Sequence, residues 1–160
     1  MARAACCLIL LAFVCAGAAG AETFKTYQGA WFAVRYPASF TIKPQQKSAS
    51  AEGYDAVSFI SPDGLVEFYV YSPQWSGEPQ WIHRRQGETQ TSYSRETARS
   101  RTIINVTRQG PGYTRSYADY RDAMCGTRWV FGYQYRNQAA YNKYRAQYLR
   151  FKQSLQQYAD

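Results

Sequence analysis

The chain has 160 residues, a formal net charge of +8 at pH 7 and an aromatic content of 17%. This length is typical of one domain that buries its own hydrophobic core. A single histidine, His83, and scattered carboxylates exclude the common zinc motifs and the clustered acids of calcium sites. We therefore expect no metal and no cofactor.

Residues 1–21 have the pattern of a secretory signal peptide. One basic residue, Arg3, precedes an apolar run, and small residues close the segment at Ala21. The apolar run is shorter than the roughly 20 residues that a transmembrane helix needs. We predict cleavage near Ala21 and a single domain over residues 22–160 that is periplasmic or secreted.

The leader carries three of the four cysteines, so cleavage leaves only Cys125. Lipid modification at Cys15 is an alternative fate, but Ala12 and Val14 are unusual before a lipidated cysteine. The simplest expectation for Cys125 is a small, buried apolar side chain. An intermolecular disulfide or a reactive thiol is the alternative.

Charge is distributed unevenly along the exported part. Residues 22–79 hold 4 basic and 6 acidic side chains, whereas residues 80–160 hold 14 and 5. This asymmetry predicts a basic face that meets anionic lipid headgroups, an acidic polysaccharide or an acidic protein. An ordinary solvated surface rich in arginine is the alternative.

Two strand pairs are predicted in the first half of the chain. Residues 31–36 are bulky and β-branched, and residues 40–43 are expected to be their short partner. Residues 55–60 and 65–71 alternate in polarity and flank Ser61-Pro62-Asp63-Gly64. Because Pro presets φ and Gly accepts positive φ, this tetrapeptide predicts a tight hairpin turn.

The sequence predicts one long connection in the middle of the chain, followed by strands. Residues 72–87 contain two prolines and two glycines, which disfavour long regular structure, so we expect at most a short helix near residues 80–85. Strands are predicted at 101–107, 113–121 and 125–135. In the last of these, alternation predicts one aromatic face that contains Cys125 and one small or basic face.

The C-terminal segment changes to a helical period. An apolar stripe recurs at steps of three and four over a predicted helix at residues 138–157, with Asn137 as its N-cap. The stripe should cover the aromatic face of the preceding strand; a membrane-surface helix is the competing interpretation. The predicted fold class is α+β, with a mainly antiparallel sheet covered by this helix and an α/β/α sandwich as the fuller version.

The segment Trp31-Phe-Ala-Val-Arg-Tyr-Pro-Ala-Ser-Phe40 resembles the opening hairpin of the Mog1/PsbP-like families. The tail Phe151-Lys-Gln-Ser-Leu155 is similar to the end of their last helix, and the hairpin at residues 61–64 falls where they place a strand pair. The resemblance implies a sheet between helices, although this chain lacks a long helix after its early hairpin. Members serve as photosystem accessory subunits, partners of small GTPases or envelope proteins, which implies binding or assembly.

The candidate contact residues combine an aromatic loop with the basic half of the chain. Tryptophan and arginine are the side chains that interfaces favour. The indoles have an equally simple alternative, which is to cap the edge of the core. The candidate binding residues are Trp75, Trp81, Arg84, Arg85, Arg128 and Arg136.

These observations predict an exported, non-catalytic binding or assembly module of the bacterial envelope. Its expected partner is an envelope protein or an anionic envelope polymer. Arginines interleaved with tyrosines on a sheet would also suit nucleic acid, but export argues against that ligand. The alternative function is a small hydrolase with a Cys125 nucleophile activated by His83. No catalytic residue is assigned.

Overall fold

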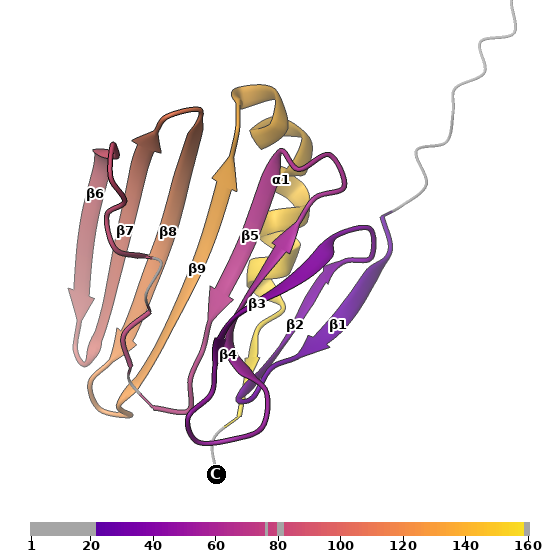
Figure 1. Cartoon of the computed structure of the whole chain (residues 1–160). Coiled ribbons are helices and arrows are strands. Elements are labelled where there is room, and N and C mark those ends of the chain that lie inside the picture. Colours follow the sequence, from indigo (N-terminus) through magenta and orange to yellow (C-terminus); the bar gives the residue numbers. More distant parts are fainter. Residues whose placement is uncertain (1–21, 76, 80–81, 159–160) are drawn as a thin grey trace, which may run out of the picture.

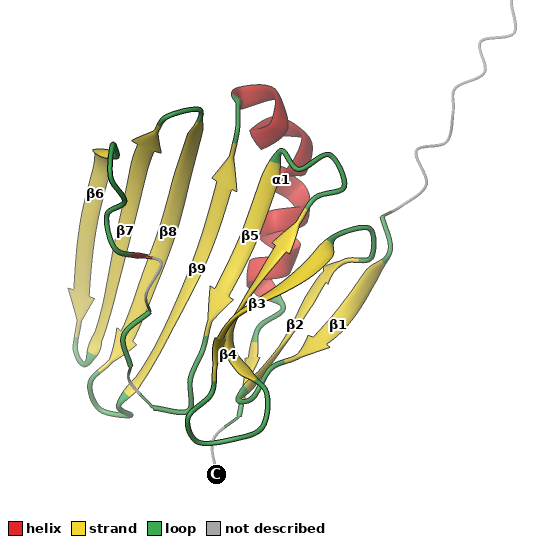
Figure 2. Ribbon diagram, in the orientation of Figure 1, coloured by secondary structure: helices red, strands yellow, loops and turns green. Residues whose placement is uncertain are grey.

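The computed structural model describes residues 22–75, 77–79 and 82–158. A seven-stranded antiparallel sheet forms the main layer, and one helix with a three-stranded sheet forms the second (Figures 1 and 2). The predicted leader, residues 1–21, lies outside the described residues. The elements are β1 (Phe24–Gln28), β2 (Phe32–Pro37), β3 (Thr41–Lys47), β4 (Tyr54–Ile60), β5 (Val66–Tyr71), β6 (Thr89–Ala98), β7 (Arg101–Gly110), β8 (Tyr113–Asp122), β9 (Thr127–Tyr135), α1 (Gln138–Gln153) and β10 (Gln156–Gln157).

The prediction that residues 40–43 pair with β2 is wrong. β2 pairs with β1 and β10 in the small sheet, whereas β3 pairs with β4 at the edge of the main sheet. Between β2 and β3 the chain crosses from one layer to the other, and Phe40 marks the crossing. Its ring lies 5.0 Å from that of Phe68 in the main sheet and 5.6 Å from that of Tyr144 on the helix. Burying this ring stabilises the crossing.

The hairpin of β4 and β5 is confirmed, with Gly64 at a φ of 66°. Asp63 does more than close the turn. Its carboxylate accepts hydrogen bonds from the backbone N–H of Leu65 at 3.1 Å, from Lys143 Nζ at 2.9 Å and from Tyr144 Oη at 2.8 Å. The turn is thereby tied to the first half of α1.

The four strands β6 to β9 form a meander that extends the main sheet beyond the helix (Figure 1). The prediction that Cys125 begins the last strand on its buried face is wrong, because β9 begins at Thr127 and Cys125 is exposed. The Asp122 carboxylate accepts from the N–H groups of Met124 at 3.0 Å and Cys125 at 3.4 Å. Gly126 follows with a φ of 62°. These contacts bend the chain into a turn at the position of the thiol.

The helix begins as predicted, since the Asn137 side chain accepts from the N–H of Ala140 at 2.9 Å. It ends at Gln153, four residues before the predicted end. Ser154 caps it by donating to the Phe151 carbonyl at 2.8 Å and by accepting from the Arg35 N–H at 2.8 Å. This contact redirects the chain, so that β10 pairs with β2.

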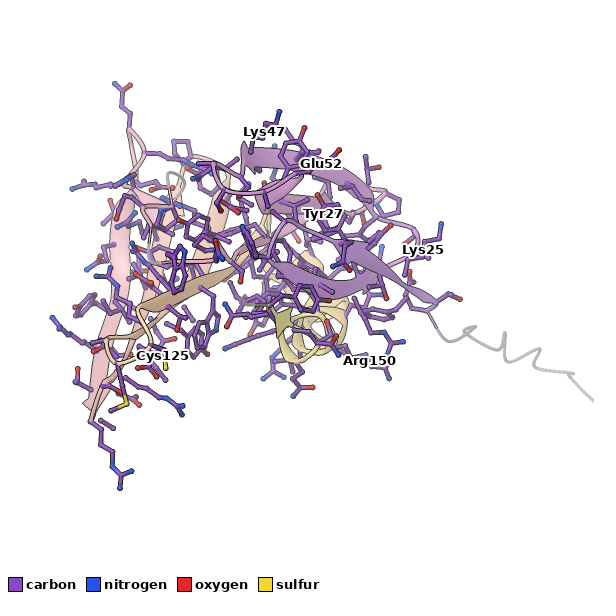
Figure 3. The ribbon with its side chains drawn as sticks, turned by 90° about the horizontal axis from the view of Figure 1, so that it is seen from below. Lys25, Tyr27, Lys47, Glu52, Cys125 and Arg150 are labelled. Carbon is purple, nitrogen blue, oxygen red and sulfur yellow. The ribbon has the colours of Figure 1, made fainter. Side chains whose placement is uncertain are left out.

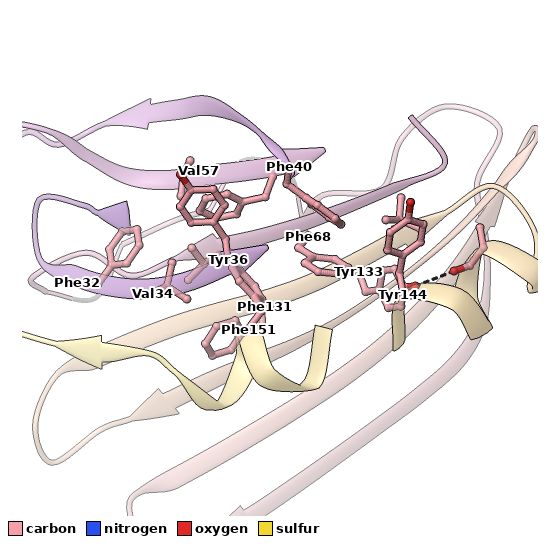
Figure 4. Close-up of a cluster of buried hydrophobic side chains, with 14 residues drawn as sticks. Phe32, Val34, Tyr36, Phe40, Val57, Phe68, Phe131, Tyr133, Tyr144 and Phe151 are labelled. Carbon is pink, nitrogen blue, oxygen red and sulfur yellow. Dashed lines mark hydrogen bonds between the residues drawn. The ribbon is translucent and has the colours of Figure 1, made fainter. Parts of the chain in front are cut away.

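The core between the two layers is aromatic. Phe151 of α1 is fully buried, and its ring lies 5.4 to 5.8 Å from the rings of Phe59, Phe68 and Phe131 (Figure 4). Tyr133 stacks on Tyr148 at 4.8 Å between ring centroids. The predicted docking of the helical stripe on the aromatic face of β9 is therefore confirmed.

The opposite face of the main sheet is covered by the connection between β5 and β6. We call residues 72–88 the strap; of these, 76, 80 and 81 lie outside the described residues. The strap crosses in front of β7, β8 and β9 in Figure 1. Its described part contains no α-helix, so it takes the place of the second helical layer of an α/β/α sandwich. Within the described residues, no helix is both long and apolar enough to span a membrane.

Candidate functional site

The described contact residues that the sequence predicted come from the strap, from β9 and from the segment directly after β9. Trp75 is 57% exposed on the strap, and Trp81 lies outside the described residues. Arg84 and Arg85 are exposed but bound to neighbours: Arg84 Nε donates to the Glu88 carbonyl at 2.8 Å, and Arg85 Nη1 donates to Gln134 Oε1 at 2.9 Å. Arg136 is exposed just after β9.

Arg128 is buried, with a relative exposure of 3%. Its guanidinium donates to the Asp119 carboxylate at 2.9 and 2.8 Å, to Glu78 Oε2 at 2.9 Å and to the Gly77 carbonyl at 2.6 Å. Every one of these contacts is internal, and two of them reach the strap. The expectation that Arg128 faces a partner is therefore corrected: it holds the strap on the sheet.

A second buried arginine fixes the other end of the strap. Arg115 and Glu88 both have fully buried side chains and form a bidentate pair with two hydrogen bonds of 2.6 Å. Arg115 Nη2 also donates to the His83 carbonyl at 2.7 Å. Burial would raise the pKa of Glu88, but hydrogen bonds from Arg115, the Arg85 N–H and Tyr113 lower that pKa to about 2. Glu88 is thus ionised and paired at neutral pH.

These pairs show that part of the positive charge in the second half of the chain lies inside the fold and not on a basic face. Arg108 follows the same pattern, since its Nη1 donates to the strap carbonyl of Ile82 at 2.6 Å. A sheet-wide platform of arginines for an anionic ligand is therefore not present on this face. Three of the 14 basic side chains counted in residues 80–160, Arg108, Arg115 and Arg128, attach the strap to the sheet.

A different surface carries cations that form no ion pair with any described residue. Three hollows follow one another around the end of α1, with volumes of about 590, 320 and 330 Å³. Leu155 lines the first and second, and Tyr120 and Trp129 line the second and third. We call this surface the cationic track. Its members used below are Phe24, Arg35, Tyr120, Trp129, Arg150, Lys152 and Leu155.

The first hollow lies between the small sheet and the C-terminal turn of α1. Arg35 projects from β2 and Arg150 from the helix, and both are exposed. The Arg150 guanidinium lies 6.0 Å from the centroid of the Phe24 ring. An aromatic ring beside a guanidinium holds it by a cation–π contact and leaves its N–H groups available. Figure 3 labels Arg150 beside the helix and Cys125 well away from it.

The second and third hollows share a wall made of two rings. Tyr120 of β8 and Trp129 of β9 are direct cross-strand neighbours, and their rings stack at 5.3 Å with an interplanar angle of 4°. Lys152 reaches over this stack from the helix, with Nζ 5.3 Å from the Tyr120 ring centroid. The wall is partly exposed because α1 covers β9 but not β7 and β6 (Figure 1).

The electrostatic state of the track differs from that of the strap. Among the ion pairs of the described residues, none involves Arg35, Arg150 or Lys152. Arg101, at the far end of the third hollow, is neutralised by Asp122 at 3.0 Å. Arg150 and Lys152 also lie in the last turn of α1, where positive charges interact favourably with the helix dipole. That role does not explain Arg35, which comes from another element.

Sequence reasoning missed this track because its members are far apart in the sequence. They come from β1, β2, β8, β9, α1 and the turn after α1. One signal was present: Arg150 and Lys152 fall off the apolar stripe of the helix. Their ring neighbours, however, come from β1 and β8, and no local pattern places those strands beside the helix.

The structure gives no catalytic pairing of Cys125 with His83. Cys125 lies in the β8–β9 turn, and the side-chain contact described for His83 is with Glu78 at 3.6 Å. No described hydrogen bond joins the thiol to the imidazole. Within the residues that the structure describes, no group of three or more His, Cys, Asp or Glu side chains is placed to hold a metal ion.

Comparisons with known proteins bear on the fold. No family model matches the chain, and no curated protein matches it by sequence. The chain is similar to the solution structure of cyanobacterial PsbP (CyanoP) from Synechocystis sp. PCC 6803, with a TM-score of 0.53 and 8% identity. The match covers 89% of this chain and 96% of that one. Together with the antiparallel sheet and its C-terminal helix, this similarity shows that the chain has a PsbP-like α+β fold.

Proposed function

We propose that this protein is an exported, non-catalytic binding module of the bacterial envelope that holds an extended anionic polymer along the cationic track. The observation that carries the proposal is a run of cations that have no ion pair within the described residues and lie near aromatic rings: Arg150 beside Phe24, with Arg35 lining the same hollow, then Lys152 beside the Tyr120–Trp129 stack. The rings support Arg150 and Lys152 by cation–π contacts and also offer apolar faces to the ligand.

The shape of the track favours a chain-like ligand. Adjacent hollows share lining residues, so an occupant of one hollow continues into the next. The rings suit the flat apolar faces of sugar units, and the cations suit their acidic substituents. An acidic segment of an envelope protein is the competing ligand, and the binding experiment distinguishes the two.

Two further observations support a binding role. The sequence resembles PsbP-like domains, whose members act as accessory or binding subunits, and the fold agrees with that resemblance. The exposed thiol of Cys125 has no described contact with His83, which leaves the hydrolase without an activated nucleophile. The predicted leader supplies the envelope location. Expression of the full chain in a bacterium should yield an exported form that begins at Glu22, as read by intact mass.

The direct test uses a charged polymer and its neutral parent. We expect dextran sulfate to bind the protein and dextran of the same length not to bind, with an affinity that falls as salt rises. Poly-L-glutamate serves as the probe for an acidic peptide. If it binds more tightly than dextran sulfate at equal charge density, the polymer assignment is replaced by a protein ligand.

A matched pair of variants locates the binding surface. Replacing Arg35, Arg150 and Lys152 with glutamine should weaken dextran sulfate binding at least tenfold, about 1.4 kcal/mol. The control replaces three exposed cations off the track, Lys43, Lys47 and Arg136, which removes the same charge. Equal losses in the two variants would show that net charge alone attracts the polymer, and the track would lose its role.

A further inference from the structure

The two edges of the main sheet are built differently. β3, at one edge, contains Pro44 and two lysines, and its pairing with β4 shifts register twice. Proline, lysine and bulges are the devices that prevent an edge strand from pairing with another chain. The β3 edge is therefore protected against pairing with a strand of another chain.

β6, at the other edge, has almost none of this protection. All ten of its residues are exposed, and it pairs only with β7 in the described sheet. Its one register shift lies between Gln90 and Ser92, so the stretch from Ser92 to Ala98 pairs regularly. This stretch contains neither proline nor lysine, and its two charged residues, Arg95 and Glu96, have opposite signs. The free N–H and C=O groups of a regular edge can accept a further strand.

We propose that two copies of this chain pair through β6 in an antiparallel arrangement centred on Ser94. A twofold axis perpendicular to the sheet keeps the faces of both copies aligned, so opposed residues must share a face. Centring on Ser94 places Tyr93 opposite Arg95 of the partner subunit, and the reverse contact follows by symmetry. It also places Glu96 opposite Ser92 of the partner subunit.

Neighbouring registers are less favourable. Centring on Arg95 would set two arginines directly opposite each other, which is destabilising. Centring on Tyr93 would leave Arg95 opposite Thr91 of the partner subunit and forfeit both arginine–tyrosine contacts. Tyr93 is 54% exposed in the single chain, so the dimer would cover this ring with the guanidinium of Arg95 of the partner subunit.

The pairing has a geometric consequence. Because the axis is perpendicular to the sheet, both helices lie on one face of the joined sheet, and both cationic tracks lie on that same face. A long ligand could then engage two tracks at once. The dimer itself does not depend on the proposed function, since β6 contributes no residue to the track.

Cysteine cross-linking tests the register. In a Cys125→Ser background, Ser94→Cys places two thiols at the axis, within the roughly 7 Å between Cα atoms that a disulfide tolerates. Ser92→Cys is the matched control, because it is equally exposed on the same face but lies about 13 Å from its symmetry mate along the strand. Mild oxidation should yield a covalent dimer for Ser94→Cys and not for Ser92→Cys.

Sedimentation completes the test without cysteines. The wild-type chain should show a concentration-dependent dimer mass, and Ser94→Lys should be monomeric because it opposes two lysines at the axis. The proposal is overturned if the wild type stays monomeric at the highest concentration reached. It is also overturned if the two cysteine variants cross-link at equal rates. Neither result alters the polymer-binding test on the track.

Discussion

The strap and the cationic track use the same kinds of side chain in opposite ways. Under the strap, Arg115 and Arg128 are buried and satisfied by carboxylates and carbonyls. Around the end of α1, Arg35, Arg150 and Lys152 are paired with no described carboxylate. The difference teaches that a basic sequence does not by itself indicate a basic surface. What matters is whether the fold places an acid beside each cation.

The two regions also differ in what a substitution should change. Removing one partner of a buried pair leaves the other charge buried and unpaired, which costs much more than an exposed pair contributes. An exposed cation is solvated in the folded and unfolded chains alike. Substitutions under the strap should therefore lower stability, and substitutions on the track should lower affinity.

The largest expected effect is at Arg115. Arg115→Met leaves the Glu88 carboxylate buried without its bidentate partner, so we expect the free energy of unfolding to fall by about 3–5 kcal/mol. Urea denaturation measures this loss. The double variant Arg115→Met, Glu88→Met should recover part of the stability, because it leaves no uncompensated charge. A loss below about 1 kcal/mol for the single variant would contradict a structural role for the pair.

Packing beneath the strap gives a second, smaller effect. The Tyr69 ring lies directly on Gly132 of the neighbouring strand, and a Cβ built at Gly132 would overlap that ring. Gly132→Ala should therefore destabilise the protein by about 1–3 kcal/mol, the usual range for overpacking. Thermal unfolding measures the change. A Tm equal to that of the wild type would show that Tyr69 moves aside freely.

Acid should weaken the strap in a defined pH range. The pKa of Glu88 is lowered from 4.5 to about 2 in the folded chain. A lowered folded-state pKa adds stability above the unfolded value, and that stability is lost as the pH falls from about 4.5 through about 2. The stability difference between wild type and Glu88→Gln should shrink across this range in urea titrations. A difference independent of pH would contradict an ionised Glu88.

The smallest effect on stability is expected from the track. Replacing Arg35, Arg150 and Lys152 with glutamine removes only favourable helix-end charges and exposed cation–π contacts. The cost should be about 1 kcal/mol or less. Urea denaturation of the triple variant checks this value. A loss near that of Arg115→Met would mean that these cations hold the fold and do not serve a ligand.

Local patterns predicted the parts of the fold that local chemistry determines. The turn at Ser61–Gly64, the N-cap at Asn137 and the docking of the helical stripe on β9 all depend on residues close in sequence or on simple periodicity. The resemblance to PsbP-like domains rested on about ten residues, and the similarity of the structures supports it.

The errors have a common physical cause. Cys125, Arg128 and the partner of β2 were predicted from alternation and proximity, but each is fixed by a specific contact, which is local for Cys125 and distant for Arg128 and β2. Asp122 bends the chain at Cys125, and Gly77 and Glu78 of the strap bury Arg128. The track was missed because Arg35 of β2 and the two cations of α1 are far apart in the sequence and share one surface only in the folded chain.

One paired measurement tests the division between strap and track most directly. The affinity for dextran sulfate and the free energy of unfolding would be determined for the triple track variant and for Arg115→Met, each under conditions where it is fully folded. We predict that the track variant loses affinity at least tenfold with nearly unchanged stability, and that Arg115→Met loses stability with nearly unchanged affinity. The reverse pattern, or a joint loss of both in each variant, would contradict the division.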